Sequence, residues 1–187
     1  MEEDLKKCIE VLRSGGVILY PTDTVWGLGC DAGNEKAVQR IFELKKRADN
    51  KALLLLVDSF GRLQSYVESI PDLAFDLIEM SEKPLTIIYS QGKNLAANVL
   101  ADDGSIGIRI TKEPFSHALC ERFRRPIVST SANTSGQPTP RNFLEIEPYI
   151  VESVDYVVKY RQNDATPAKA SSIIKLGPKS YVKIIRE

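Results

Sequence analysis

The chain has 187 residues, 43% of them hydrophobic and 27% charged, which is the composition of a soluble domain with a core large enough to fold unaided. Its 25 basic residues balance 25 acidic ones, so bulk charge indicates no nucleic acid or membrane partner, and such contacts would need a local patch. We expect a single domain over residues 1–187.

Cysteine and histidine usage argues against a metal site. The three cysteines are odd in number and form no CxxC pair, and the chain has one histidine, which favours reduced structural thiols. The N-terminus is acidic, unlike a secretory signal, and no apolar run approaches the ~18 residues of a membrane span. We therefore expect a cytoplasmic protein without membrane contact.

Hydrophobic periodicity predicts alternating helices and strands. Helices are predicted at residues 5–12, 34–45, 73–80 and 115–123. Buried strands are predicted at residues 17–20, 52–57, 85–89, 106–110 and 127–129, with further strands at 156–159, 172–176 and 181–185. Gly15 should stop the first helix, and Asn34 should cap the second. The order indicates a mixed α/β domain.

Two polar loops follow predicted strands, where open α/β sheets place their ligand sites. One runs from Pro21 to Thr24, with Gly27 and Gly29 just beyond it. The other, Ser129–Gly136, carries six hydroxyl or amide side chains. Both could bind an anion. A capped turn closed by its own side chains explains the second loop equally well, and a tight bend explains the glycines.

A basic cluster ends the second predicted helix. Lys45, Lys46 and Arg47 are followed by Lys51, so irregular backbone could direct several cations at one polyphosphate. Cations at a helix C-terminus are also favoured by the helix dipole, and a solvated helix end is the simpler interpretation of this cluster alone.

Arg109 stands in an otherwise apolar predicted strand. It shares one face with Ser105, while Ile106 and Ile108 lie on the other. An arginine there could bind a carboxylate bidentately. The alternative is a structural ion pair, for which Asp23 and Asp31 are the candidate partners. We favour the ligand interpretation.

Several common nucleotide and nucleophile motifs are absent. The chain lacks the GxxxxGK[ST] loop, and Gly27-Leu28-Gly29 lacks the third glycine of a dinucleotide fingerprint. His117 has no triad partner at a recognisable spacing. ATP, if bound, must be bound in another way, without a protein nucleophile.

Three motifs follow one another along the chain: the segment 20–29 (YPTDTVWGLG), the pair Lys45-x-Arg47 and the segment 129–136 (STSANTSG). Together they resemble the YrdC-like family of threonylcarbamoyl-AMP synthases. Segments 84–86, 106–109 and 171–174 also match family signatures, so nearly the whole chain is covered. The chain departs from the family pattern at Trp26, Ala48, the pair Lys51-Ala52 and Leu56.

The resemblance implies a twisted, mixed-direction sheet flanked by helices around a large concave cavity. It implies a reaction of L-threonine, bicarbonate and ATP, with Mg²⁺, giving threonylcarbamoyl-AMP and pyrophosphate for N6-threonylcarbamoyladenosine modification of tRNA. It also implies a downstream enzyme that transfers the group to tRNA. By motif, the catalytic residues would be Lys45 and Arg47; the ATP contacts would be Lys45, Arg47, Lys51, Ser105, Ser131, Asn133, Thr139 and Ser172; the threonine contacts would be Thr24, Arg109 and Ser129.

Fixed cations, hydroxyls and Mg²⁺ would stabilise charge at an attacked phosphoryl group without a protein nucleophile, which agrees with the missing triad. An RNA-binding module that uses the same cations is the alternative from another class. It is weakened by few aromatic residues near the motifs, since single-strand binders usually stack bases on several. A carbamoyl-transfer enzyme of the same fold, with carbamoyl phosphate as donor, is a third possibility.

Overall fold

The computed structural model describes residues 1–46, 53–177 and 181–187. Their strands form one sheet of nine, in the order β7-β1-β2-β6-β3-β5-β4-β8-β9. The strands are β1 Ile18–Tyr20, β2 Gly27–Gly29, β3 Leu54–Val57, β4 Leu85–Tyr89, β5 Ile106–Ile110, β6 Ile127–Ser131, β7 Tyr156–Val157, β8 Ser172–Leu176 and β9 Val182–Arg186. The sheet directions are mixed: β1 with β7, β3 with β5 and β4 with β8 are parallel, and the other pairs are antiparallel.

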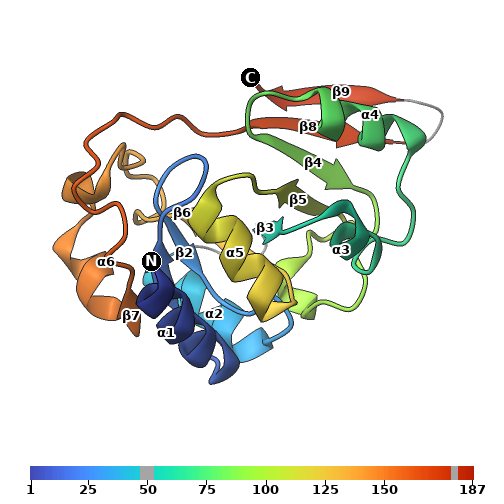
Figure 1. The fold of residues 1–187 in the computed structure, drawn as a ribbon. Coiled ribbons are helices and arrows are strands. Elements are labelled where there is room, and N and C mark those ends of the chain that lie inside the picture. The colour runs from blue at the N-terminus through green and yellow to red at the C-terminus, as the bar shows by residue number, and fades with distance from the viewer. Residues whose placement is uncertain (47–52, 178–180) are drawn as a thin grey trace.

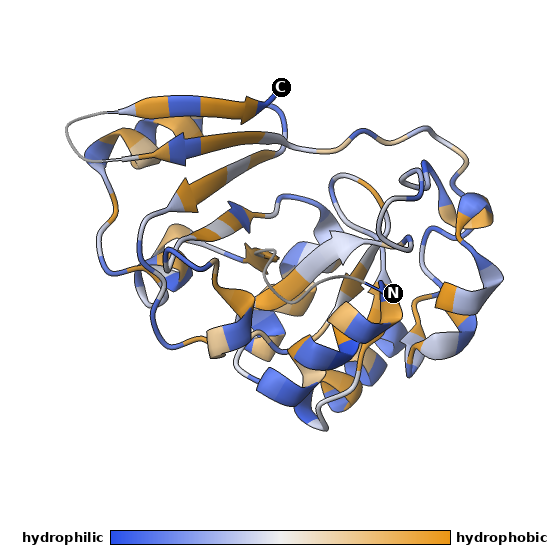
Figure 2. Ribbon diagram, turned by 180° about the vertical axis from the view of Figure 1, so that it is seen from behind, coloured by the Kyte–Doolittle hydropathy of each residue, from blue (hydrophilic) through white to orange (hydrophobic). Residues whose placement is uncertain are grey.

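The helices are α1 Glu2–Arg13, α2 Glu35–Leu44, α3 Phe60–Gln64, α4 Asp72–Met80, α5 Pro114–Phe123 and α6 Pro148–Ser153, with short 3-10 turns η1 Ala97–Val99 and η2 Phe143–Glu145. In Figure 1, α1 and α5 lie side by side, with α1 against β1 and β7 and α5 against β3, while α4 is at the β8–β9 end of the sheet. Figure 2 shows hydrophobic residues along the central strands and on one side of the helices. The expected mixed α/β fold with flanking helices is confirmed.

The predicted helix signals at the first two helices are confirmed. Asn34 caps α2, because its side-chain oxygen accepts a hydrogen bond of 3.1 Å from the Ala37 N–H. After α1, Gly15 adopts φ +79°, a left-handed conformation that glycine takes without steric cost. None of the helices in the described ranges is long and apolar enough to cross a lipid bilayer.

No strand was predicted at Gly27–Gly29, where a tight bend was one interpretation of the glycines, but the structure has a strand there. This strand is β2, which pairs with both β1 and β6. A Cβ on Gly29 would lie 2.6 Å from Cε1 of Tyr20 and 3.0 Å from the carbonyl oxygen of Val128. The glycine therefore permits close packing between strands, and three residues were too few to show strand alternation.

Two short helices were not predicted. Helix α3 has 5 residues and α6 has 6, which is too little sequence for a helical period to emerge. The predicted strand at residues 127–129 extends to Ser131, so three of the six polar side chains assigned to the loop belong to β6. This extension places Ser131 beside β2, opposite Gly27.

Candidate functional site

A hollow of about 280 Å³ opens where β2, β5, β6, β8 and β9 meet the loop between β1 and β2. Its lining is mostly hydroxyl groups, two guanidinium groups and small apolar residues. The lining residues are Thr24, Val25, Gly27, Leu54, Arg109, Ser129, Thr130, Ser131, Thr139, Ala170, Ser171, Ile173 and Arg186. No carboxylate belongs to this lining among the residues that the structure describes.

Five of the residues that the sequence singled out meet in this hollow: Thr24, Arg109, Ser129, Ser131 and Thr139. They come from the β1–β2 loop, β5, β6 and the segment after β6, which are far apart along the chain. The expected gathering of the two polar loops and the arginine at one place is therefore a property of the fold.

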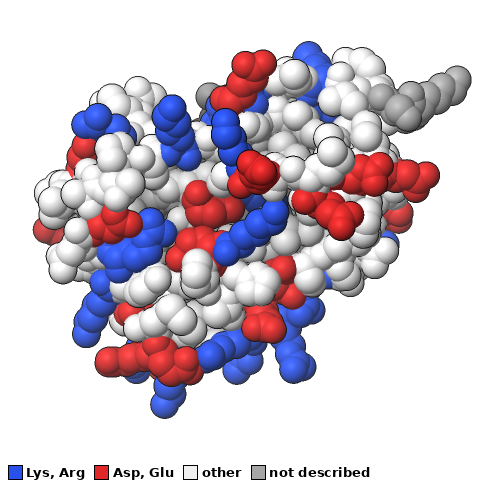
Figure 3. Space-filling model, turned by 45° about the horizontal axis from the view of Figure 1, so that its top comes forward, with Lys and Arg blue, Asp and Glu red and all other residues white. Residues whose placement is uncertain are grey.

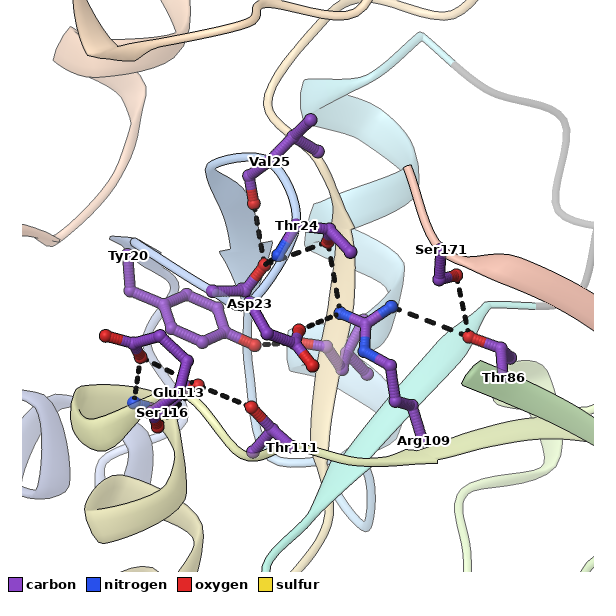
Figure 4. A network of polar contacts seen from close by, with 12 residues as sticks. Tyr20, Asp23, Thr24, Val25, Thr86, Arg109, Thr111, Glu113, Ser116 and Ser171 are labelled. Atoms are coloured by element: carbon purple, nitrogen blue, oxygen red, sulfur yellow. Dashed lines mark hydrogen bonds and ion pairs between the residues drawn. The ribbon is translucent and has the colours of Figure 1, made fainter. Parts of the chain in front are cut away.

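Arg109 is held from two sides, as Figure 4 shows. Its Nη2 lies 2.9 Å from Oδ1 of Asp23 and donates a 3.2 Å hydrogen bond to Oγ1 of Thr24. Its Nη1 lies 3.5 Å from Oγ1 of Thr86 on β4, at the limit of a hydrogen bond. The side chain is 4% exposed, and its Nε has no hydrogen-bond partner in the described structure. The structural ion pair considered for Arg109 exists, with Asp23 as partner, and the same side chain also lines the hollow.

The Asp23 carboxylate lies behind Arg109, at the wall of a separate cavity of about 250 Å³. Burial raises the pKa of Asp23, the guanidinium of Arg109 opposes this rise, and the Glu113 carboxylate adds to it. Asp31, the other partner considered for Arg109, instead pairs with Arg125 at 2.9 Å.

Arg186, on the last strand, was not among the predicted site residues. Its Nε donates a 2.9 Å hydrogen bond to the carbonyl oxygen of Ser171, and its Nη2 donates one of 3.4 Å to Oγ of Ser171. The Ser171 hydroxyl shares a 2.9 Å hydrogen bond with Thr86, whose hydroxyl also faces Arg109. Partial burial and the charge of Arg109 lower the pKa of Arg186. The two arginines thus face one hollow and are linked through Thr86 and Ser171.

Lys45 binds the loop after β6 and does not line the hollow. Its Nζ donates hydrogen bonds to the carbonyl oxygens of Ser131 and Asn133, the latter at 2.7 Å. The residue is 3% exposed. The backbone N–H of Ser135 returns a 2.8 Å hydrogen bond to the Lys45 carbonyl. The C-terminal end of α2 and the segment 131–135 are therefore hydrogen-bonded to each other.

Three other predicted nucleotide contacts lie outside the hollow's lining. Asn133 is buried, and its Nδ2 donates to the carbonyls of Thr134 and Gln137. Ser105 lies just before β5, at the strand's far end from Arg109, and Ser172 begins β8 one position beyond the lining residue Ser171. Arg47 and Lys51 lie outside the described residues.

A second hollow, of about 500 Å³, adjoins the first. Thr139 lines both. The second is bounded by Lys46, Thr134, Gln137, the segment 138–140, Glu145 and Glu147. An extended ligand could therefore lie across Thr139 with one end in each hollow.

Charge is distributed without a single dominant sign. Figure 3 shows basic and acidic side chains interspersed over the face that it presents. Within residues 1–46, 53–177 and 181–187, no group of three or more histidine, cysteine or acidic side chains gathers as a metal site. The first hollow, in contrast, offers guanidinium and hydroxyl donors and suits an anionic ligand.

Comparison with known proteins agrees with this geometry. The sequence model Sua5_yciO_yrdC, described as "Telomere recombination", matches residues 10–187. This chain belongs to the Sua5/YciO/YrdC family. The threonylcarbamoyl-AMP synthase of Pseudoalteromonas translucida is 36% identical over 160 residues, covering 84% of this chain and 86% of that protein. The synthase of Pseudomonas aeruginosa strain UCBPP-PA14 is 36% identical over 149 residues, covering 79% of this chain and 80% of that protein.

Solved structures of the family share the fold. P. abyssi Sua5 complexed with L-threonine superimposes with a TM-score of 0.86 at 25% identity, covering 100% of this chain and 54% of the other. This chain thus spans about half the length of that Sua5 chain. E. coli YciO superimposes with a TM-score of 0.82 at 25% identity, covering 100% of this chain and 90% of the other.

Proposed function

We propose that this chain is a threonylcarbamoyl-AMP synthase. It would join L-threonine, bicarbonate or CO₂, and ATP into threonylcarbamoyl-AMP and pyrophosphate, and a cytoplasmic downstream enzyme would use the product to modify tRNA. The observation that carries the proposal is the hydroxyl-lined hollow, whose lining includes both Arg109 and Arg186. Its donors suit both anions of the reaction, a carboxylate and a phosphate chain.

We place the amino acid at the Arg109 end. Thr24, Arg109 and Ser129 line that part of the hollow, and they match the motif positions expected to hold threonine. A guanidinium donates charge-assisted hydrogen bonds to a carboxylate, while neighbouring hydroxyls can donate to or accept from polar groups of the ligand.

We place the phosphates toward Ser131 and Arg186, with the nucleoside reaching across Thr139 into the second hollow. Ser131 and Thr139 line the first hollow, and Thr139 lines both. Because the lining has no carboxylate in the described structure, Mg²⁺ would enter on the phosphates as part of the substrate. Arg47 and Lys51 stay predictions as phosphate contacts, and so do Lys45, Asn133, Ser105 and Ser172.

The reaction then needs positioning more than a protein nucleophile. The threonine amine adds to CO₂, forming an N–C bond and losing a proton, and an oxygen of the resulting carbamate attacks the α-phosphorus. The bond from that phosphorus to the bridging oxygen breaks, and pyrophosphate leaves. Fixed guanidinium and hydroxyl groups stabilise the charge on the phosphoryl oxygens, and a shared hollow brings the reactants together.

The proposal is tested by incorporation of labelled bicarbonate into an adenylate that requires both threonine and ATP. We expect Arg109→Gln and Arg186→Gln each to reduce kcat/KM by about 10- to 100-fold, the loss of one charged hydrogen-bonding group. Arg125→Gln is the control, because this arginine is 64% exposed and absent from the hollow's lining. A folded protein supplied with Mg²⁺ that yields no threonine-dependent adenylate would contradict the proposal.

Binding of RNA as the sole function would predict a basic groove, whereas acidic and basic side chains alternate on the face shown in Figure 3. Tight RNA binding with a steep salt dependence, without ATP binding, would favour that alternative.

A further inference from the structure

The two arginines of the hollow have unequal charge environments. Oδ1 of Asp23 lies 2.9 Å from Nη2 of Arg109, and the side chains of this pair are 11% and 4% exposed. The hydrogen bonds of Arg186 within the described structure, in contrast, go to the carbonyl and hydroxyl oxygens of Ser171, which are uncharged. Across the described ranges, no ion pair joins Arg186 to a carboxylate.

This inequality matters because the two proposed ligands differ in net charge. A free amino acid is a zwitterion with no net charge, whereas a phosphate group carries between one and two negative charges at neutral pH. A carboxylate fixed behind one arginine occupies one of its donors, leaves other donors for a ligand and cancels most of the charge at a distance. The other arginine keeps its charge.

We propose that Asp23 determines ligand specificity within the hollow: it cancels the charge of Arg109 so that this end accepts a zwitterionic amino acid and rejects phosphate. Arg186, with neutral partners, attracts the phosphate chain. This inference rests on the proposed function, since it assigns the amino acid to the Arg109 end.

Electrostatics sets the size of the effect. Consider a ligand that places one more negative charge about 5 Å from the Asp23 carboxylate. At an effective dielectric constant of about 20, the repulsion would weaken binding of that ligand on the order of 100-fold. The hollow is open to solvent and salt, which reduces the effect, so we expect about tenfold discrimination from this carboxylate.

The test is the variant Asp23→Asn, which keeps the side-chain shape and removes the charge. Labelled L-threonine is bound to the full chain in equilibrium dialysis at pH 8 without ATP, and inorganic phosphate is added as competitor. We expect the ratio of phosphate affinity to threonine affinity to rise about tenfold in Asp23→Asn. A ratio is used because loss of Arg109 orientation would weaken both ligands together.

The control is Asp58→Asn. Asp58 pairs with Arg62 at 3.0 Å, its side chain is also 11% exposed, and it does not line the hollow. Its ratio should equal that of the wild type. An unchanged ratio in Asp23→Asn, or an equal rise in Asp58→Asn, overturns the inference.

Arg109→Gln separates this inference from the proposed function. If Arg109→Gln binds threonine as tightly as the wild type, the amino acid has been placed wrongly and both fail. If it loses threonine while Asp23→Asn leaves the ratio unchanged, the role of Asp23 alone fails.

Should Asp23→Asn not fold, judged by circular dichroism, the two arginine variants decide. We expect Arg186→Gln to weaken phosphate binding about tenfold, whereas Arg109→Lys, which keeps the charge that Asp23 cancels, should weaken it less than about threefold, because only Arg186 retains an uncancelled charge. The reverse order overturns the inference.

Discussion

The buried ammonium of Lys45 offers the sharpest test of how the site is held together. We expect Lys45→Met to destabilise the protein, because the variant keeps the apolar stem and removes the donors that reach the carbonyls of Ser131 and Asn133. A hydrogen bond from a charged donor contributes about 1.5–3 kcal/mol. Asn133 N–H also donates to the Ser131 carbonyl, at 2.9 Å, so the two losses will not add fully.

We therefore expect a loss of about 2–3 kcal/mol in the free energy of unfolding, measured by equilibrium urea denaturation. In a domain of this size that corresponds to a fall in Tm of roughly 5–10 °C. The control is the neighbouring Lys46→Met. Lys46 is exposed and lies over the Tyr149 ring with 5.4 Å to its centroid, so its loss should cost less than about 1 kcal/mol. Equal stability of Lys45→Met and the wild type would refute the reasoning.

Two further predictions concern packing and pH. Gly29→Ala should lower the free energy of unfolding by about 1–3 kcal/mol in urea denaturation, because the new methyl group would lie 2.6 Å from the Tyr20 ring. The control Gly61→Ala, whose methyl group would have nothing within 4 Å, should be neutral or stabilising. Equal effects of the two substitutions would contradict this prediction. Burial opposes ionisation of Asp4, but hydrogen bonds, the largest from the Lys159 N–H, lower its pKa below the usual value of 3.8. The Asp4 carboxylate therefore contributes its full stabilisation above pH 3.8, and this stabilisation is lost as the pH falls through the lower pKa of the folded state. The stability difference between wild type and Asp4→Asn should shrink over this pH range. A difference that grows on acidification would contradict it.

The sequence predicted elements whose signals are local. Alternation placed Arg109 on a polar face of its strand, and Asn34 marked the start of α2, because both depend on residues within a few positions. The grouping of Thr24, Ser129 and Arg109 was implied by the family resemblance, and the structure brings all three side chains to the lining of one hollow.

What the sequence could not supply depends on pairings between distant segments. Lys45 stands at a helix end, and nothing nearby reveals that its ammonium reaches carbonyls 86 and 88 positions later. Arg186 enters the hollow only because β9 pairs with β8 and β8 with β4. The alternatives left open for Arg109, ligand contact or ion pair with Asp23, were not exclusive, since one guanidinium has several donors.

The placement of Arg186 on an edge strand bears on when the site comes into existence. Every residue of β9 is exposed, and its neighbour in the sheet is β8 alone. During synthesis the N-terminal loops and the central strands leave the ribosome first, so a nascent chain can form most of the hollow and still lack one of its two guanidinium groups. In the finished protein, fraying of this strand would remove the same group while the core stays folded. Ligand affinity is therefore expected to report on the pairing of the last strand, well before global unfolding.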